Sequence, residues 1–240
     1  QKICFSFLFW SFHQLVYIVK QKKELKEEEI PTDKKELAIY YKKSADKGNI
    51  EAMYEYANIS MTGDGIPVNK VEASKYYKKG ADKGHIESMI KYATMVKTGD
   101  GIEVNKEEAS IYFKEAADAG NSEAMNSYAL MLDTGDGIET NKSEAIKYYK
   151  LAIKKGNPNS MNNYAISLRD GDGIPVDKQE AYRYFKMAAD QGHCNAICNL
   201  GLMFEKGDGI PSNKKEAVRY FKIGADKGHT NSMTKYATML

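Results

Sequence analysis

One four-residue sequence, Gly-Asp-Gly-Ile, occurs five times in this chain, starting at residues 63, 99, 135, 171 and 207, which is once every 36 residues. An unbroken period of this length is typical of proteins built from stacked helical hairpins. Such a chain grows by adding hairpins rather than by enlarging one core. The ten glycines that mark the repeat are Gly63, Gly65, Gly99, Gly101, Gly135, Gly137, Gly171, Gly173, Gly207 and Gly209.

Each period contains two helical patterns. In residues 70–83, Ala73, Tyr76, Tyr77, Gly80 and Ala81 recur at intervals of three and four, which predicts an amphipathic helix. Residues 86–98 have the same spacing and predict a second helix. The small residues let two helices approach closely, and the aromatic rings fill the remaining space. We therefore predict an all-α fold of stacked helix–turn–helix repeats.

The sequence also marks where the helices begin and end. A glycine follows each first helix, and the next residue, Asn or His, is placed to cap the second helix. His85, His193 and His229 occupy this position one or more repeats apart, which favours caps over metal ligands. An Asn or Asp three residues before a glutamate, as in Asn141 and Glu144, predicts a capping box at each first helix.

We place a domain boundary near Pro31, because proline disfavours a helical conformation in the residue before it. Residues 1–32 are an aromatic-rich and then charged N-terminal segment, in which residues 3–19 are open to three interpretations: the end of an upstream domain or a capping helix, a membrane or signal remnant, or disorder. Residues 33–240 divide into six repeats: 33–69, 70–105, 106–141, 142–177, 178–213 and a truncated 214–240.

The ends of the chain lead us to expect a fragment of a longer protein, since it begins with Gln1 and stops within a repeat. Stacked repeats normally end in a polar capping unit. We therefore expect an exposed apolar end at Met233, Tyr236, Ala237 and Leu240.

Charge and cysteine content argue against several classes of protein. The 35 basic and 33 acidic residues are interleaved, without the basic stripe that nucleic-acid binding requires. Three cysteines are too few for a disulfide framework and favour a reducing compartment such as the cytoplasm. Residues 3–19 and the sequons at Asn58 and Asn141 leave a lumenal or membrane-associated location open. Cys194 and Cys198 are interpreted as small, partly buried residues, with a strained disulfide or a metal site as alternatives.

The Gly-Asp-Gly-Ile loop has a structural interpretation. A phosphate-binding loop would need a preceding strand and further signature residues, and a calcium loop would need alternating oxygen ligands and a closing glutamate. We expect the first Gly to end the second helix, Asp to turn the chain, and the second Gly to release it. Ile66 and its equivalents are expected to plug the gap between hairpins. No catalytic, cofactor or metal site is predicted.

The unit A-x-x-[YF]-[YF]-x-x-[AG]-A-x-x-G-[NH], an A-M-x-x-Y-A-like second helix and G-D-G-I-P-V-[ND] resemble the Sel-one-like repeat (SLR) family, a relative of the tetratricopeptide repeat (TPR). The resemblance covers residues 33–240. It implies a right-handed α-solenoid, a TPR-like superhelix, that binds a protein or peptide and has no catalytic centre. Ile153, Leu37, Leu200 and Gly201 depart from the pattern and are interpreted as packing variants.

The leading functional hypothesis is a non-enzymatic, monomeric interaction scaffold or adaptor. Three alternatives stay open: a regulatory or docking segment of a larger enzyme such as a kinase or ubiquitin ligase, a hydrolase like some cysteine-rich relatives, and a lumenal adaptor held by residues 3–19. For the repeats themselves we expect neither nucleic acid nor membrane as a partner.

Two variable columns on the predicted first helices are candidates for partner binding. One holds Ile39, Lys75, Ile111, Lys147, Arg183 and Arg219, and the other holds Lys43, Lys79, Glu115, Leu151, Met187 and Ile223. The second column changes from charged to apolar, which the fold does not require. We predict that its last three members form an apolar strip beside the last three of the first column, suited to an amphipathic or acidic peptide. The alternative is that these apolar residues pack against neighbouring helices.

A third column is lysine in every repeat: Lys42, Lys78, Lys114, Lys150, Lys186 and Lys222. Five of these lysines have an aspartate four residues later. This spacing predicts local ion pairs on a solvated face rather than a ladder for an acidic partner.

Overall fold

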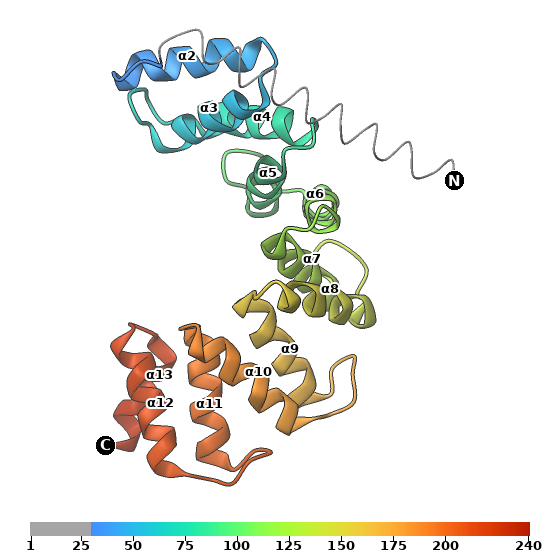
Figure 1. The fold of residues 1–240 in the computed structure, drawn as a ribbon, viewed down its shortest axis with the longest axis vertical. Coiled ribbons are helices and arrows are strands. Elements are labelled where there is room, and N and C mark those ends of the chain that lie inside the picture. Colours follow the sequence, from blue (N-terminus) through green and yellow to red (C-terminus); the bar gives the residue numbers. More distant parts are fainter. Residues whose placement is uncertain (1–29) are drawn as a thin grey trace. The chain divides into compact units, whose positions relative to one another are not determined.

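A computed structural model describes residues 30–240, and this part of the chain consists of twelve α-helices without a strand (Figure 1). The predicted all-α fold of helix–turn–helix repeats is confirmed. The N-terminal segment 3–19 lies outside the described residues. The helices are α2 (Lys34–Asp46), α3 (Ile50–Thr62), α4 (Lys70–Ala81), α5 (Ile86–Thr98), α6 (Lys106–Asp118), α7 (Ser122–Thr134), α8 (Lys142–Lys154), α9 (Pro158–Asp170), α10 (Lys178–Asp190), α11 (Cys194–Lys206), α12 (Lys214–Asp226) and α13 (Thr230–Met239).

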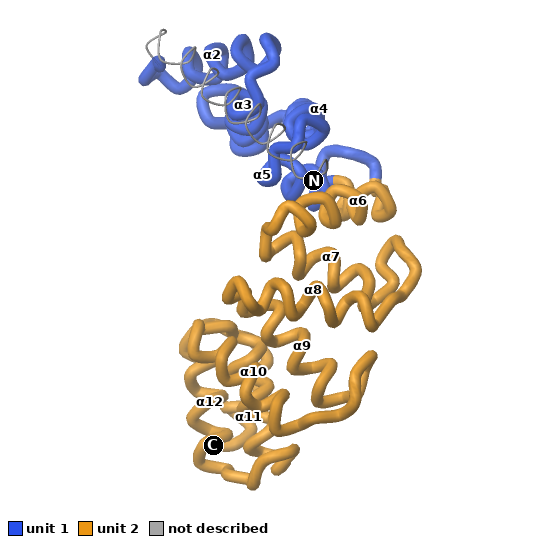
Figure 2. Tube along the Cα trace, turned by 45° about the vertical axis from the view of Figure 1, so that its right-hand side comes forward, with its two compact units in different colours: residues 1–95, 99–103 blue, residues 96–98, 104–240 orange. Residues whose placement is uncertain are grey.

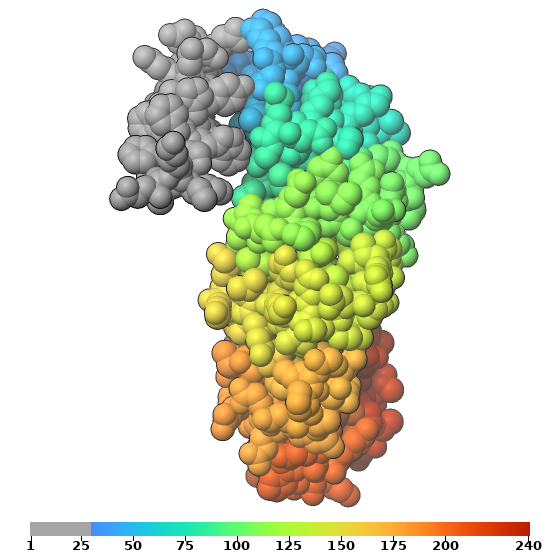
Figure 3. Space-filling view, turned by 90° about the vertical axis from the view of Figure 1, so that its right-hand side faces the viewer, coloured from blue at the N-terminus to red at the C-terminus, as the bar shows by residue number. Residues whose placement is uncertain are grey.

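The chain divides into two compact units (Figure 2). Unit 1 comprises residues 1–95 and 99–103, and its described part holds α2, α3, α4 and most of α5. Unit 2 comprises residues 96–98 and 104–240, with α6 to α13. Within unit 2 the hairpins follow one another in the order of the sequence (Figure 3).

Aromatic rings of consecutive hairpins hold each unit together. In unit 2, Tyr128 of α7 meets Tyr148 of α8 edge to face with ring centroids 4.9 Å apart, and Tyr164 of α9 meets Tyr184 of α10 in the same way at 5.0 Å. Such pairs contribute about 0.5–1.5 kcal/mol beyond the area that they bury. The second helix of one hairpin thus joins the first helix of the next.

The core of unit 2 repeats the small and large columns that the sequence predicts. Ala145, Ala181 and Ala217 are completely buried on α8, α10 and α12, as are the rings of Tyr149, Phe185 and Phe221 four residues later. The fifth repeat keeps this packing with different residues. Leu200 is completely buried, and a Cβ on Gly201 would lie 2.5 Å from the Phe221 ring. This confirms that Leu200 and Gly201 are packing variants.

Side-chain caps begin all the described helices as predicted. Asn49, His85, Asn121, Asn157, His193 and His229 cap the second helices, and the histidines do so by accepting a hydrogen bond at Nδ1. His85 Nδ1 accepts from the Ser88 amide at 3.2 Å. The three histidines are therefore caps, which accounts for their place in the repeat.

Of the two hydrogen bonds that define a capping box, only the one from the glutamate amide to the cap side chain is present as predicted. The cap oxygen accepts the glutamate amide, as from Glu144 to Asn141 at 3.0 Å. However, the cap amide does not need the glutamate, because the Asn141 amide donates to the Leu132 carbonyl at 2.8 Å. That carbonyl lies in the last turn of α7, where no helical partner is available. Glu144 instead accepts a hydrogen bond from the side-chain amide of its cap, Asn141 Nδ2, at 3.1 Å. The expectation that the glutamate accepts the backbone amide of the cap is therefore wrong.

An ion pair ties each Gly-Asp-Gly-Ile loop to the start of its own hairpin. The loop aspartate pairs with the first lysine of the first helix, 30 residues earlier, at 2.6 Å in every case. The pairs are Lys34–Asp64, Lys70–Asp100, Lys106–Asp136, Lys142–Asp172 and Lys178–Asp208. The aspartate therefore does more than turn the chain, because it joins the end of the second helix to the beginning of the first.

The second glycine of the loop is required by close approach. Gly65 has φ +80°, and a Cβ on it would lie 2.5 Å from the carbonyl carbon of Lys34 and 2.6 Å from its oxygen. The loop backbone thus lies directly on the first turn of α2. Ile66 is only half-buried, so it fills the space beside the loop in part.

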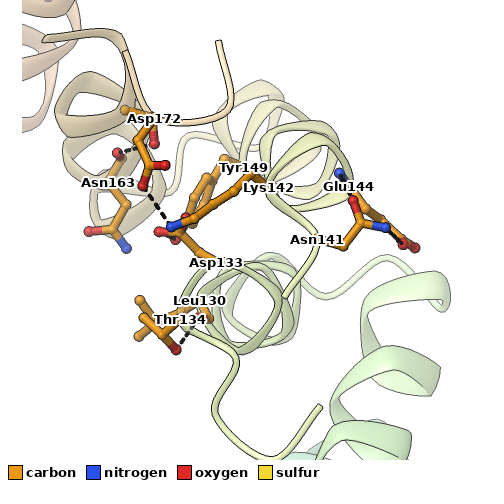
Figure 4. A network of polar contacts seen from close by, with 10 residues as sticks. Leu130, Asp133, Thr134, Asn141, Lys142, Glu144, Tyr149, Asn163 and Asp172 are labelled. Carbon is orange, nitrogen blue, oxygen red and sulfur yellow. Dashed lines mark hydrogen bonds and ion pairs between the residues drawn. The ribbon is translucent and has the colours of Figure 1, made fainter. Parts of the chain in front are cut away.

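The repeat at residues 142–177 carries a polar network at such a loop. Figure 4 shows Lys142 between Asp133 and Asp172, with Tyr149 beside it. The Lys142 ammonium lies 2.8 Å from the Asp133 carboxylate and 2.6 Å from the Asp172 carboxylate. The Tyr149 hydroxyl donates to Asp133 at 3.3 Å, and burial raises the pKa of Tyr149. One lysine therefore connects the end of α7, the start of α8 and the following loop.

The last hairpin is exposed in part. Met233 and Leu240 are exposed by 44% and 87%, and Ala237 is exposed, as expected. In contrast, Tyr236 packs with Met239 against the buried cluster of Cys198, Ala217 and Phe221. The expectation of an exposed Tyr236 is therefore wrong, because the preceding repeat supplies a surface that covers it.

We predict that Gly65→Ala lowers the free energy of unfolding more than Gly84→Ala, by at least about 1 kcal/mol in urea denaturation. Both glycines have a positive φ, +80° and +87°, so both substitutions introduce similar backbone strain. A Cβ on Gly84 would have no atom within 4 Å, whereas a Cβ on Gly65 would meet the Lys34 backbone. Equal losses in the two variants would contradict the contact.

We predict that Asp136→Asn lowers the free energy of unfolding at pH 7 by up to about 1 kcal/mol. Lys106 and then Lys97, at 2.6 and 3.1 Å, hold the pKa of Asp136 below its usual range. A lowered pKa stabilises the fold above the unfolded pKa, about 3.9, and this contribution is lost as the pH falls further. Denaturation curves from pH 7 to pH 3 should therefore converge for variant and wild type. A difference that is constant over this range would refute the pairing.

Candidate functional site

The predicted apolar strip lies on three first helices of unit 2. Leu151 on α8 and Met187 on α10 are exposed by 43% and 46%. Ile223 on α12 is half-buried. The exposure of the first two side chains leaves them available to a partner, whereas Ile223 also contributes to packing.

The cations beside the strip are partly neutralised. Arg183 donates to Glu180 at 3.0 Å, and Arg219 donates to Glu216 at 2.8 Å while lying 4.4 Å from the centre of the Tyr220 ring. Both glutamates belong to predicted capping boxes, but neither accepts the backbone amide of its cap residue. Lys147 is exposed, without an ion pair to another described residue. The attraction that this surface exerts on an acidic partner is therefore smaller than the sequence indicates.

The lysine column forms local pairs in three repeats. Lys78, Lys114 and Lys186 pair with the aspartate four residues later, at 3.8, 2.5 and 3.0 Å. Lys42 is an exception, because it reaches Glu72 of the next first helix at 2.8 Å. The Asp46 carboxylate instead accepts the hydroxyl of Tyr76. The prediction of local pairs thus holds for these three lysines and is wrong for Lys42.

A second surface, which the sequence analysis missed, is an open groove of about 690 Å³ along the second helices α9, α11 and α13. Its lining residues recur at intervals of three and four on each helix, so they form one face. Most of them are polar, and asparagines are prominent. The asparagines of this groove are Asn162, Asn163, Asn195, Asn199 and Asn231.

The sequence does contain a signal for this groove. The second-helix position five residues after the cap reads Tyr54, Ile90, Asn126, Asn162, Cys198 and Thr234 through the six repeats. The variation is as large as on the first helices, where it was used to select candidates. Comparing columns on both helices of each repeat would have found the groove.

The ionisable groups of the groove are mostly uncharged or paired. Lys235 pairs with Glu205 at 3.0 Å. Burial, with a smaller effect of His229, lowers the pKa of His193, which lies next to the groove on the cap of α11. Burial also raises the pKa of Cys198, so this thiol is protonated at neutral pH. The groove therefore carries little net charge.

Both cysteines of α11 are free thiols, Cys198 buried and Cys194 half-buried, so the disulfide alternative is wrong and the packing interpretation is confirmed. In the described part of the chain, no three His, Cys, Asp or Glu side chains are grouped to hold a metal ion. No helix among residues 30–240 is long and apolar enough to cross a membrane.

Comparison with known proteins assigns the repeats. The Sel1 repeat matches residues 31–49, 50–85, 86–121, 122–157, 158–193 and 194–229. Each match after the first begins at the start of a second helix. No curated protein sequence is significantly similar to the chain.

Solved structures have the same fold. A Sel1 repeat protein from Oxalobacter formigenes is 27% identical, with a TM-score of 0.71 over 79% of this chain and 76% of that one. The protective antigen c5321 of uropathogenic Escherichia coli, which displays an SLR fold, is 24% identical, with a TM-score of 0.76 over 92% of this chain. This chain spans 48% of that protein. By its repeats and its structural relatives, the chain belongs to the Sel1 repeat family.

Proposed function

We propose that the chain is a non-catalytic scaffold that binds a protein or peptide on an exposed face of its repeats. Sel1 repeat proteins are generally protein-interaction scaffolds. What supports a specific surface here is the exposure of Leu151 and Met187 at positions that hold Lys43, Lys79 and Glu115 in the preceding repeats. Since a charged residue is accommodated at this position in three repeats, the packing of the repeat does not require an apolar residue there.

The strip suits a partner helix with an apolar face. Leu151 and Met187 stand at the same position of consecutive first helices, so they offer two anchors to a segment that crosses those helices. Methionine adapts to partners of different shape, because its side chain is unbranched and polarisable. Lys147 adds a cation on the same helix as Leu151. An acidic flank on the partner would gain from Lys147 more than from the paired arginines.

We predict that the double variant Leu151→Lys and Met187→Lys recovers about tenfold less of its partner proteins than the wild type, or less still. The reason is that buried anchor residues dominate the binding energy of an interface. The substitutions copy lysines that the same column already holds at Lys43 and Lys79, so the thermal unfolding midpoint should be unchanged. Quantitative affinity mass spectrometry of wild type and variant, each produced in cells, measures the loss.

Ile111→Lys is the matched control. Ile111 is exposed by 52% on α6 and lies in the other column, which holds lysine at Lys75 and Lys147. It removes an exposed apolar side chain from the same unit but outside the strip. If the double variant retained every partner while remaining folded, or if Ile111→Lys lost the same partners, the strip would not be the binding surface.

A further inference from the structure

We propose that the groove along α9, α11 and α13 binds an uncharged, extended segment of a partner protein by hydrogen bonds to the main-chain amides of that segment. This inference rests on the proposed scaffold function but places recognition on the second helices, which the apolar strip does not include.

A chain of side-chain amides crosses the wall of the groove. Asn199 Nδ2 donates to Asn162 Oδ1 at 3.1 Å, and Asn162 Nδ2 donates to Asn163 Oδ1 at 3.2 Å. Asn163 Nδ2 then donates to Asn126 Oδ1 at 3.2 Å. The hydrogen bonds run in one direction from α11 through α9 to α7, so each amide fixes the orientation of the next. A ligand therefore meets amides that are already oriented.

The network leaves hydrogen-bonding capacity for a ligand. A primary amide has two N–H groups and two carbonyl lone pairs, and the network uses only one N–H group of Asn199. The carbonyl oxygen of Asn199 accepts no hydrogen bond from the part of the chain that the structure describes. Asn163 and Asn199 are half-buried, and both line the groove. One remaining donor and one acceptor match the N–H and C=O of a peptide unit.

Packing alone does not require amides at these positions. Asn162 is only 3% exposed, and the first two repeats hold Tyr54 and Ile90 in its column. Burying a side-chain amide costs free energy unless its hydrogen bonds are made, and an apolar side chain at this position would carry no such cost. Because Asn162 accepts the hydrogen bond of Asn199, we assign it a positioning role for the half-buried amide of Asn199.

Charge and size favour an uncharged peptide. The lysine of the groove is already paired with Glu205, so no free cation attracts an anionic ligand. Ile166 and Leu202 line the groove beside the asparagines and can accept one or two apolar side chains. Neighbouring packed helices lie about 8–10 Å apart, which an extended peptide covers in about three residues. The groove volume of about 690 Å³ also falls within the usual range for binding sites.

The test starts from a phage-displayed library of random linear peptides selected on the full chain. Fluorescence polarisation then measures the affinity of synthetic selected peptides. We expect Asn199→Leu, which keeps the size of the side chain but removes the amide, to weaken binding about tenfold or more. N-methylation of single peptide bonds in the ligand should have the same effect with the wild-type protein. This second measurement does not depend on the folding of a variant.

Leu151→Lys with Met187→Lys is the control and should leave peptide affinity unchanged. Binding that tolerates N-methylation at every position, or that depends on a charged side chain of the peptide, would overturn the inference. The inference would also be overturned if the selected peptides bound Asn199→Leu but no longer bound the control variant. That result would not contradict the proposed role of the strip. A selection that yields no binding peptide also overturns the inference. The strip is tested separately, by affinity mass spectrometry of the double lysine variant.

Discussion

The contact between each Gly-Asp-Gly-Ile loop and the first turn of its own hairpin is the constraint on which the repeats depend. Its ion pair is exposed and contributes only up to about 1 kcal/mol by itself. Its geometric role is larger, because a glycine such as Gly65 lets the loop backbone touch the backbone of Lys34. The two helices of a hairpin are thereby held at both ends, by the short turn between them and by the returning loop.

This division of roles frees other positions for recognition. Alanines and aromatic rings fill the core of each repeat, and the caps and loops fix where helices begin and end. The remaining columns form two chemically different surfaces in unit 2. The first helices present an apolar strip at Leu151 and Met187, whereas the second helices present an uncharged groove with Asn163 and Asn199. The two proposals together assign a helical partner segment to the first helices and an extended partner segment to the second helices.

The helices, their caps and the buried columns could be predicted from the sequence because they depend on residues a few positions apart. The partner of Asp64 could not, since Lys34 lies 30 residues away and only the packed hairpin brings the two together. The hydrogen-bond partner of the Asn141 backbone amide depends on the path of the loop, which directs this amide to the Leu132 carbonyl instead of to Glu144. The groove was missed because variation was sought on the first helices alone, and its amide chain joins side chains of three separate helices.

The central claim is that the loops maintain the fold and the variable columns do not. The most direct test compares the free energy of unfolding of two variants within one repeat, Gly173→Ala and Leu151→Lys, by urea denaturation. Gly173 has φ +74°, and a Cβ on it would lie 2.5 Å from Lys142. The expected loss is roughly 1–3 kcal/mol for Gly173→Ala and less than about 0.5 kcal/mol for Leu151→Lys. A larger loss for Leu151→Lys than for Gly173→Ala would contradict the claim.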